Sequence, residues 1–304
     1  MRLHAPALAA VALALAAAAP AAAAPTTIYG GHTSFYAPFS LRVNGNTLTG
    51  MLLQVDFTCD DGSGASWSGF ASFQSFKPAT VEAGDNVFTP AGISRRGTFR
   101  ATGQAAARYG EDKIGAITER LRGTVRRGTA HGTYSATLTM RDADTGAAAR
   151  TCRSDTVRWE ARSAPGRVYS GLSSSGEPLV IERSRDGRKV GIVYVAWTAP
   201  CQSGGAFEIG EGLTNFPIAT SGRFGDTWND ETKLGEGGSN VRTYALDGTL
   251  GASRASGTFG VQITEKDAAG ALTESCESPV EPWTARSTKG AKVTRPKTEI
   301  RVGP

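Results

Sequence analysis

Apolar and polar side chains alternate along two stretches of the chain. Every second residue of 53–59 is apolar up to Cys59, and the same holds for 193–201 up to Cys201. A period of two is typical of a β-strand with one buried face. Each stretch follows a two-residue hairpin signal, Asn44-Gly45 in the first case and Asp186-Gly187 in the second. The pattern predicts an early strand in each half, with its cysteine on the buried side.

Short segments of the first half recur in the second half. Both halves end on a similar segment, which runs from Trp159 to Ser163 in the first and from Trp283 to Ser287 in the second. Each half also contains three glycines separated by 26 and then 9 residues: Gly97, Gly123 and Gly132, then Gly222, Gly248 and Gly257. A step of nine is one strand plus one turn, which predicts adjacent antiparallel strands. The glycines suit a bulge or a close backbone approach.

This self-similarity predicts an internal repeat of two domains, 25–164 and 165–287. Glycine supplies 38 of the 304 residues, and the chain has little helical periodicity. Such composition suits short strands joined by tight turns, about seven to nine in each copy. We therefore predict an all-β protein of two tandem antiparallel sandwich or jelly-roll-like domains. Small closed β-barrels are the alternative.

The N-terminus resembles a secretory signal. Arg2 precedes an unbroken run of Ala, Val and Leu from Leu8 to Ala19, and small residues follow up to Ala24. This arrangement predicts a signal peptide over 1–24 and a protein that is secreted or associated with the cell envelope. No later stretch is apolar enough to predict a transmembrane segment.

Four cysteines allow three disulfide pairings. The repeat selects Cys59–Cys152 and Cys201–Cys276, which would each join an early strand to a late one. Such bonds persist outside the cytoplasm. The sequence has no Cys-x-x-Cys and no histidine near either pair, so we expect neither a zinc site nor any other metal or cofactor.

Charge is unevenly distributed. Residues 25–164 carry 16 basic and 12 acidic residues, a net of +4, whereas 165–287 carry 11 and 15, a net of −4. The segment 288–304 has five basic residues against Glu299 and predicts a flexible basic tail. This distribution is not typical of a nucleic-acid binder. It could suit attraction to an anionic envelope surface, but a solvated tail without a partner is the interpretation that we favour for such a segment.

Catalytic motifs are not evident. His32 and His131 show no ligand spacing, and the chain lacks a nucleophile elbow, a phosphate loop and a dinucleotide fingerprint. Carboxylate pairs, as glycosidases use, occur only in predicted loops. They are Asp60 with Asp61, Glu111 with Asp112, Glu208 with Glu211, and Asp226 with Asp230 and Glu231. We interpret these acids as solvated loop residues, which favours a protein that is not an enzyme.

One group of aromatic residues has no counterpart in the other copy. It lies in the first copy's extra segment, which is about 17 residues long, and consists of Trp67, Phe70, Phe73 and Phe76. Trp228 is the nearest equivalent in the second copy. Exposed rings could form a flat platform for a sugar or a protein partner. The competing interpretation is a strand or flap that packs inward.

The order of several short motifs resembles a group of secreted bacterial tandem β-repeat proteins to which no function is assigned. The motifs are Tyr169-Ser-Gly, Gly176-Glu-Pro-Leu, the strand into Cys201, Gly222-Arg-Phe, Gly257-Thr-Phe and Cys276 followed by Trp283-x-Ala285-Arg286. The resemblance implies a fold type and an exported location, and it carries no catalytic residues.

These observations favour a secreted, non-catalytic binding or structural module at the cell envelope, with a glycan or an extracellular protein as its partner. Two alternatives stay open. One is an enzyme that acts on extracellular polysaccharide through a loop carboxylate pair. The other is a carrier of a small ligand inside a β-barrel.

Overall fold

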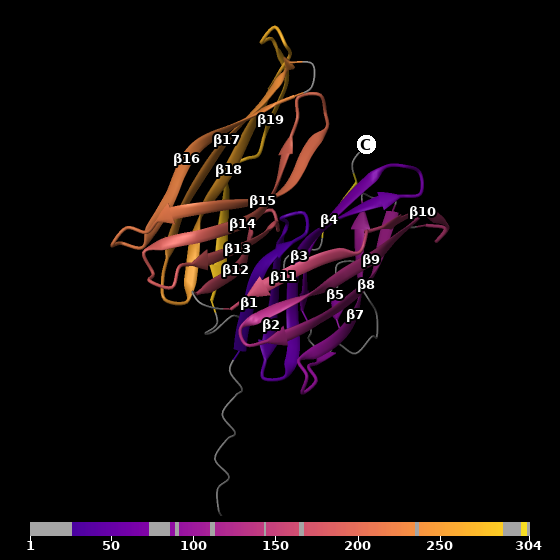
Figure 1. The fold of residues 1–304 in the computed structure, drawn as a ribbon. Coiled ribbons are helices and arrows are strands. Elements are labelled where there is room, and N and C mark those ends of the chain that lie inside the picture. Colours follow the sequence, from indigo (N-terminus) through magenta and orange to yellow (C-terminus); the bar gives the residue numbers. More distant parts are fainter. Residues whose placement is uncertain are drawn as a thin grey trace, which may run out of the picture.

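A computed structural model describes residues 26–72, 86–88, 91–109, 113–142, 144–163, 167–234, 237–287 and 299–302. Within these ranges the protein is all β, and its strands form two antiparallel sheets that lie against each other (Figure 1). The predicted fold class, two antiparallel all-β domains, is therefore confirmed. The predicted signal peptide lies outside the described residues.

The first sheet contains the strands of the N-terminal half and one short strand from the end of the chain. They are β1 (Thr26–Thr33), β2 (Pro38–Asn44), β3 (Thr47–Cys59), β4 (Gly64–Ser72), β5 (Asn86–Phe88), β6 (Ala91–Gly92), β7 (Thr98–Tyr109), β8 (Lys113–Arg126), β9 (Thr129–Asp142), β10 (Ala148–Arg153), β11 (Val157–Arg162) and β21 (Glu299–Val302).

The second sheet contains nine strands. They are β12 (Val168–Ser173), β13 (Pro178–Arg183), β14 (Lys189–Pro200), β15 (Ala206–Pro217), β16 (Arg223–Lys233), β17 (Ser239–Leu250), β18 (Arg254–Lys266), β19 (Leu272–Glu277) and β20 (Glu281–Arg286).

The two sheets have corresponding strand orders. The first runs β4-β3-β2-β1-β11-β9-β8-β7, and the second runs β15-β14-β13-β12-β20-β18-β17-β16. In both, a short strand, β10 or β19, pairs with the far half of the long strand that precedes it. Every strand of the second sheet therefore has a counterpart at the same place in the first.

In each sheet, some of the strands curl into a closed ring, and the remaining strands extend the sheet beyond it. In the first domain β10 pairs with both β9 and β3, which completes a ring of β3, β2, β1, β11, β9 and β10. In the second domain the ring closes through a single bridge between Cys201 and Cys276. This pairing describes two barrel-like domains, in which the curled sheet packs on itself around one interior.

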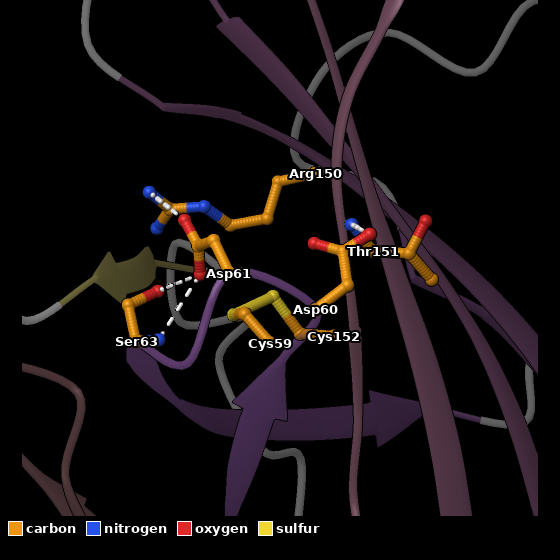
Figure 2. The surroundings of a disulfide bond; sticks show 7 residues. All are labelled: Cys59, Asp60, Asp61, Ser63, Arg150, Thr151 and Cys152. Atoms are coloured by element: carbon orange, nitrogen blue, oxygen red, sulfur yellow. Dashed lines mark hydrogen bonds and ion pairs between the residues drawn. A yellow bond between two sulfur atoms is a disulfide. The ribbon is translucent and has the colours of Figure 1, made fainter.

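A disulfide lies at each closure, and both predicted pairings are confirmed. Cys59 is joined to Cys152, and Cys201 to Cys276, with sequence separations of 93 and 75 positions. The backbone continues the closure one residue further, because Asp60 N donates to Thr151 O and Gln202 N to Ser275 O. Figure 2 shows the first of these junctions. The disulfides thus hold together strands that share few backbone hydrogen bonds.

The nine-residue glycine spacing has a specific structural role. Gly123 and Gly132 lie directly opposite each other on β8 and β9, and the ring of Trp159 covers both. A β-carbon at Gly132 would lie 1.9 Å from the Arg122 carbonyl oxygen and 2.6 Å from the indole of Trp159. Gly248, Gly257 and Trp283 repeat this arrangement in the second domain. The spacing therefore reflects a close approach of tryptophan to the backbone. Of the two predicted explanations, a bulge or a close backbone approach, the second is the one that applies.

The alternating pattern fails where the domains touch. Leu53 and Val55 face the interior as predicted, but Gln54 between them is also buried. On β14, Tyr194 and Ala196 are buried although they alternate with interior residues. The outer faces of these strands are covered because β2 and β3 of the first domain pack against β13 and β14 of the second.

Small residues allow this close contact between the domains. Ile28, Val168, Val180 and Tyr194 form an apolar cluster of their own, and Ser40 hydrogen-bonds Ser170 across the interface at 2.6 Å. A β-carbon at Gly30 would lie 2.6 Å from Val180. Under the strand correspondence Gly30 matches Ser170, and Val180 matches Ser40. Exchanging the two domains therefore converts the Ser40–Ser170 contact into the Gly30–Val180 contact, as in a two-fold symmetric interface.

The end of the chain differs from the predicted flexible tail. Residues 299–302 form β21, which pairs with Ala65–Ser68 of β4 in antiparallel register. A strand edge exposes unpaired backbone donors and acceptors, so β21 satisfies the free edge of the first sheet. Residues 288–298 lie outside the described part of the chain.

Replacing both cysteines of the second disulfide, in a Cys201→Ala/Cys276→Ala variant, should lower the free energy of unfolding of that domain by roughly 4–5 kcal/mol, because the crosslink restricts the unfolded chain. Urea denaturation followed by tryptophan fluorescence measures this change. Reduction of the wild type breaks both disulfides, so it should cause a similar loss in the second domain and a further loss in the first. An unchanged midpoint in both would contradict the role assigned to the closure.

Gly257→Ala should lower the free energy of unfolding by about 2–3 kcal/mol, because its new methyl group would meet Asp247 O at 1.9 Å and Trp283 at 2.5 Å. Gly191→Ala is the matched control, since it also lies in a strand but its nearest neighbour would be 3.5 Å away. Thermal unfolding of both variants tests this. Equal losses would show that general strand propensity, and not the tryptophan contact, explains the glycine.

Candidate functional site

The predicted aromatic platform is only partly described. Phe73 and Phe76 lie outside the described residues. Trp67 and Phe70 belong to β4, where the backbone pairs with Val55 and Leu52 of β3. This places both residues on a strand next to the edge taken by β21.

Trp228 packs into a seam of the second domain. It lies on β16, which does not pair with β15 although the two strands approach each other. The Trp228 ring stacks on Tyr244 at a centroid distance of 5.0 Å and contacts Phe216 at 5.6 Å. The Tyr244 hydroxyl donates to Glu211 at 2.7 Å. Trp228 therefore helps to fill the opening between two unpaired strands and leaves only part of its ring exposed.

Local contacts hold several acids of the predicted carboxylate pairs. Asp61 accepts from Ser63 and forms an ion pair with Arg150 at 2.7 Å, while Asp60 accepts from Thr151 N (Figure 2). Glu231 pairs with Lys233. Glu111 and Asp112 lie outside the described residues. Asp60 and Asp61 thus stabilise the turn after β3. Glu208 and Glu211 lie on β15, and Asp226, Asp230 and Glu231 lie on β16, so the prediction that these acids lie in loops was wrong.

A cleft between the domains gathers a different set of polar side chains. It encloses about 240 Å³ and receives residues from β1, β9 and β11 of the first domain and from β13 and β14 of the second. The backbone of Gly30 and Gly31 forms part of its wall. Its polar side chains are His32, His131, Glu160, Arg162, Glu182 and Tyr194. The two histidines of the described residues thus lie at one place.

A column of rings borders this cleft. Tyr36 stacks on His32 at 5.3 Å, and His32 contacts Tyr194 at 4.8 Å. Tyr36 is 62 % exposed and has a φ of 59°, in the left-handed region that costs a non-glycine residue about 1–2 kcal/mol. Hydrogen bonds of the turn hold it there, because Tyr36 N donates to Thr33 O and Thr33 N to Ala37 O. Strain of this kind is concentrated at functional sites.

Two pairs of polar side chains lie in the cleft, one within the first domain and one between the domains. His32 Nε2 lies 3.1 Å from Glu160, and its Nδ1 lies 2.7 Å from Thr33 O. Arg162 Nε reaches Glu182 of the other domain at 3.1 Å. The Glu160 side chain is 72 % exposed, whereas that of Glu182 is largely covered. One carboxylate is thus open to a ligand, and the other joins the domains.

Burial changes the acidity of the cleft's second-domain residues. It raises the pKa of Glu182, although the Arg162 guanidinium opposes this effect. Burial also raises the pKa of Tyr194 to about 12, with the charge of Glu182 adding to the shift. The Tyr194 hydroxyl therefore keeps its proton at neutral pH and can donate a hydrogen bond.

Sequence analysis missed this cleft because its residues come from strands far apart in the chain. A comparison of the two copies contains a signal that could have identified these cleft residues. His32, His131 and Glu160 stand where the second copy has Leu172, Ser256 and Thr284. Polar residues that differ between otherwise matched strands are candidates for function, since matched positions mainly serve the shared core.

Comparisons with protein-family models, curated proteins and solved structures found no match.

In the described ranges, no helix is long and apolar enough to cross a membrane. The same ranges contain no group of three or more His, Cys, Asp or Glu side chains placed to hold a metal ion. In the second domain, Trp197, Phe259 and Trp283 line a cavity of about 20 Å³, which holds at most one water.

The interior of the first domain contains one buried carboxyl group, on Glu119. Its side chain is fully covered, one oxygen accepts the Tyr134 hydroxyl at 2.5 Å, and the other has no hydrogen-bond partner. Burial raises the pKa of Glu119 to about 8. In the unfolded chain the group ionises near 4.5, so between these pH values the unfolded state has lost a proton that the folded state keeps.

We therefore expect the wild type to lose stability as the pH rises from about 4.5 to about 8, by roughly 2–5 kcal/mol. Glu119→Gln should remove this part of the pH dependence, because the amide has the same shape and does not ionise. Urea midpoints at pH 5 and pH 8 for both proteins measure the effect. Parallel pH profiles would contradict the assignment.

Proposed function

We propose that the protein is an exported, non-catalytic binding protein of the cell envelope and that a glycan occupies the cleft between its domains. The observation that carries this proposal is the exposed ring of Tyr36, which a strained backbone holds beside the polar groups of the cleft. Sugar rings bind aromatic faces through their C–H surface and pair their hydroxyls with carboxylates, guanidinium groups and imidazoles. The export signal and the two disulfides support an extracellular location.

The size and position of the cleft fit this proposal. Ligand sites occur preferentially at domain interfaces, and a volume of about 240 Å³ is below that of a site for a drug-sized molecule. A single sugar unit, or the end of a longer chain, suits this space. In the proposed arrangement Tyr36 stacks on the ring, and Glu160 and His131 bind its hydroxyls.

A second function, cleavage of polysaccharide, is favoured by one observation. Glu160 and Glu182 line the same cleft, and burial raises the pKa of Glu182, as is typical of the acid in a glycosidase pair. These two acids lie on strands, not in the loops that the sequence suggested. Against catalysis, Glu182 is engaged by Arg162.

Binding of the mature chain to a glycan array and to purified cell-wall polysaccharide tests the proposal, with affinities then measured by calorimetry. Tyr36→Ala and Glu160→Gln should each weaken binding about tenfold, because each removes a direct contact. Phe35→Ala is the matched control, since Phe35 is 61 % exposed in the same turn, whereas it is Tyr36 that stacks on His32 of the cleft. It should bind like the wild type.

Two results would contradict the proposal. The first is binding that survives both cleft substitutions but is lost in Trp67→Ala/Phe73→Ala, which would assign the ligand to the segment around β4. The second is release of reducing ends from the polysaccharide by the wild type and its loss in Glu160→Gln, which would establish the enzyme.

A further inference from the structure

A second cavity lies at the domain junction, beside the linker. It is open to solvent and encloses about 460 Å³. The ends of β11 and β20 contribute Ser163 and Ser287, and β12 and β13 with the hairpin that follows supply most of the rest. Its lining is Ile28, Ser163, Arg167, Val168, Arg183, Ser184, Arg185, Asp186, Gly187 and Ser287.

The charge of this cavity is positive. Three arginines, Arg167, Arg183 and Arg185, face a single carboxylate, that of Asp186. Asp186 Oδ1 already accepts the Ser184 hydroxyl at 2.7 Å and the Arg188 amide at 3.1 Å, so that carboxylate stabilises its own turn. The cavity therefore carries an excess of two positive charges in an otherwise acidic domain.

The three arginines have different roles. Arg183 donates Nε and Nη2 to Gly187 O at 3.2 and 2.9 Å, so it is needed for the hairpin. Arg167 and Arg185 are exposed and form no hydrogen bond or ion pair with another described side chain. Their guanidinium groups are available to a ligand.

An unpartnered hydroxyl points to the same ligand chemistry. Ser287 is 1 % exposed, and its Oγ has no hydrogen-bond partner. A buried hydroxyl without a partner costs about 1–3 kcal/mol, which an acceptor bound in the cavity would relieve. The Ser184 hydroxyl in the same lining is already engaged by Asp186 and by Lys189 O, so Ser287 supplies the hydroxyl that a ligand can use.

We propose that this cavity binds a phosphate group, with Arg167 and Arg185 at its rim and the Ser287 hydroxyl in its wall. Donors from several strands suit a group with three or four acceptor oxygens better than a carboxylate with two. The cavity is larger than a phosphate ion, so the natural ligand is a larger molecule that carries the phosphate. This site is separate from the glycan cleft and does not depend on it.

Titration of the mature chain with inorganic phosphate, followed by calorimetry at low salt, tests the proposal. Arg167→Ala/Arg185→Ala should weaken phosphate binding at least about tenfold, and Ser287→Ala by about threefold. Arg188→Ala is the matched control. Arg188 is equally exposed in the same hairpin but does not line the cavity, so binding should change less than about twofold.

Three results would overturn the proposal: no saturation by roughly 10 mM phosphate, an equal loss in Arg188→Ala, or tighter binding of glucuronate than of phosphate. The double variant keeps Arg183, so it should fold, and circular dichroism checks this. The source of the phosphate is then tested with soluble poly(glycerol phosphate) and with vesicles of phosphatidylglycerol and phosphatidylcholine. Binding to either that the double variant loses supports the site and identifies its source.

Discussion

Closure of each curled sheet is the constraint on which the rest of this protein depends. A single sheet that did not close would leave its apolar face and two edges in water. The short strands β10 and β19 bring Cys152 and Cys276 next to Cys59 and Cys201, and a disulfide holds each junction. Inside the closed sheets, Trp159 and Trp283 lie on paired glycines, which lets a large ring reach the backbone without displacing a strand.

Because each domain buries its inner face alone, outer faces remain for contact between the domains. Gly30, Ser40 and Ser170 keep that contact close, and Ile28, Val168 and Val180 make it apolar. The cleft and the arginine-lined cavity both border this interface, and each takes residues from both domains. A change in the packing of the domains would therefore alter both sites together.

The two sites offer different chemistry within one junction. The cleft combines a ring column with Glu160, His131 and Tyr194, which suits a neutral ligand rich in hydroxyls. The cavity combines free guanidinium groups with hydroxyls, which suits an anion. An envelope polymer that contains both sugars and phosphate would satisfy both sites, and this common class of ligand links the two proposals.

Much of the fold was determined by the sequence itself, since periodicity, turn residues and cysteine spacing are local or self-similar features. They predicted the strands into Cys59 and Cys201, the all-β class and both disulfides. Only the tertiary structure decided that Gln54 and Tyr194 are buried, that residues 299–302 pair with β4, and that His32, Glu160 and Glu182 meet in one cleft. The reason is physical: these positions depend on contacts between strands distant in sequence and across two domains, and no pattern along a single strand records such contacts.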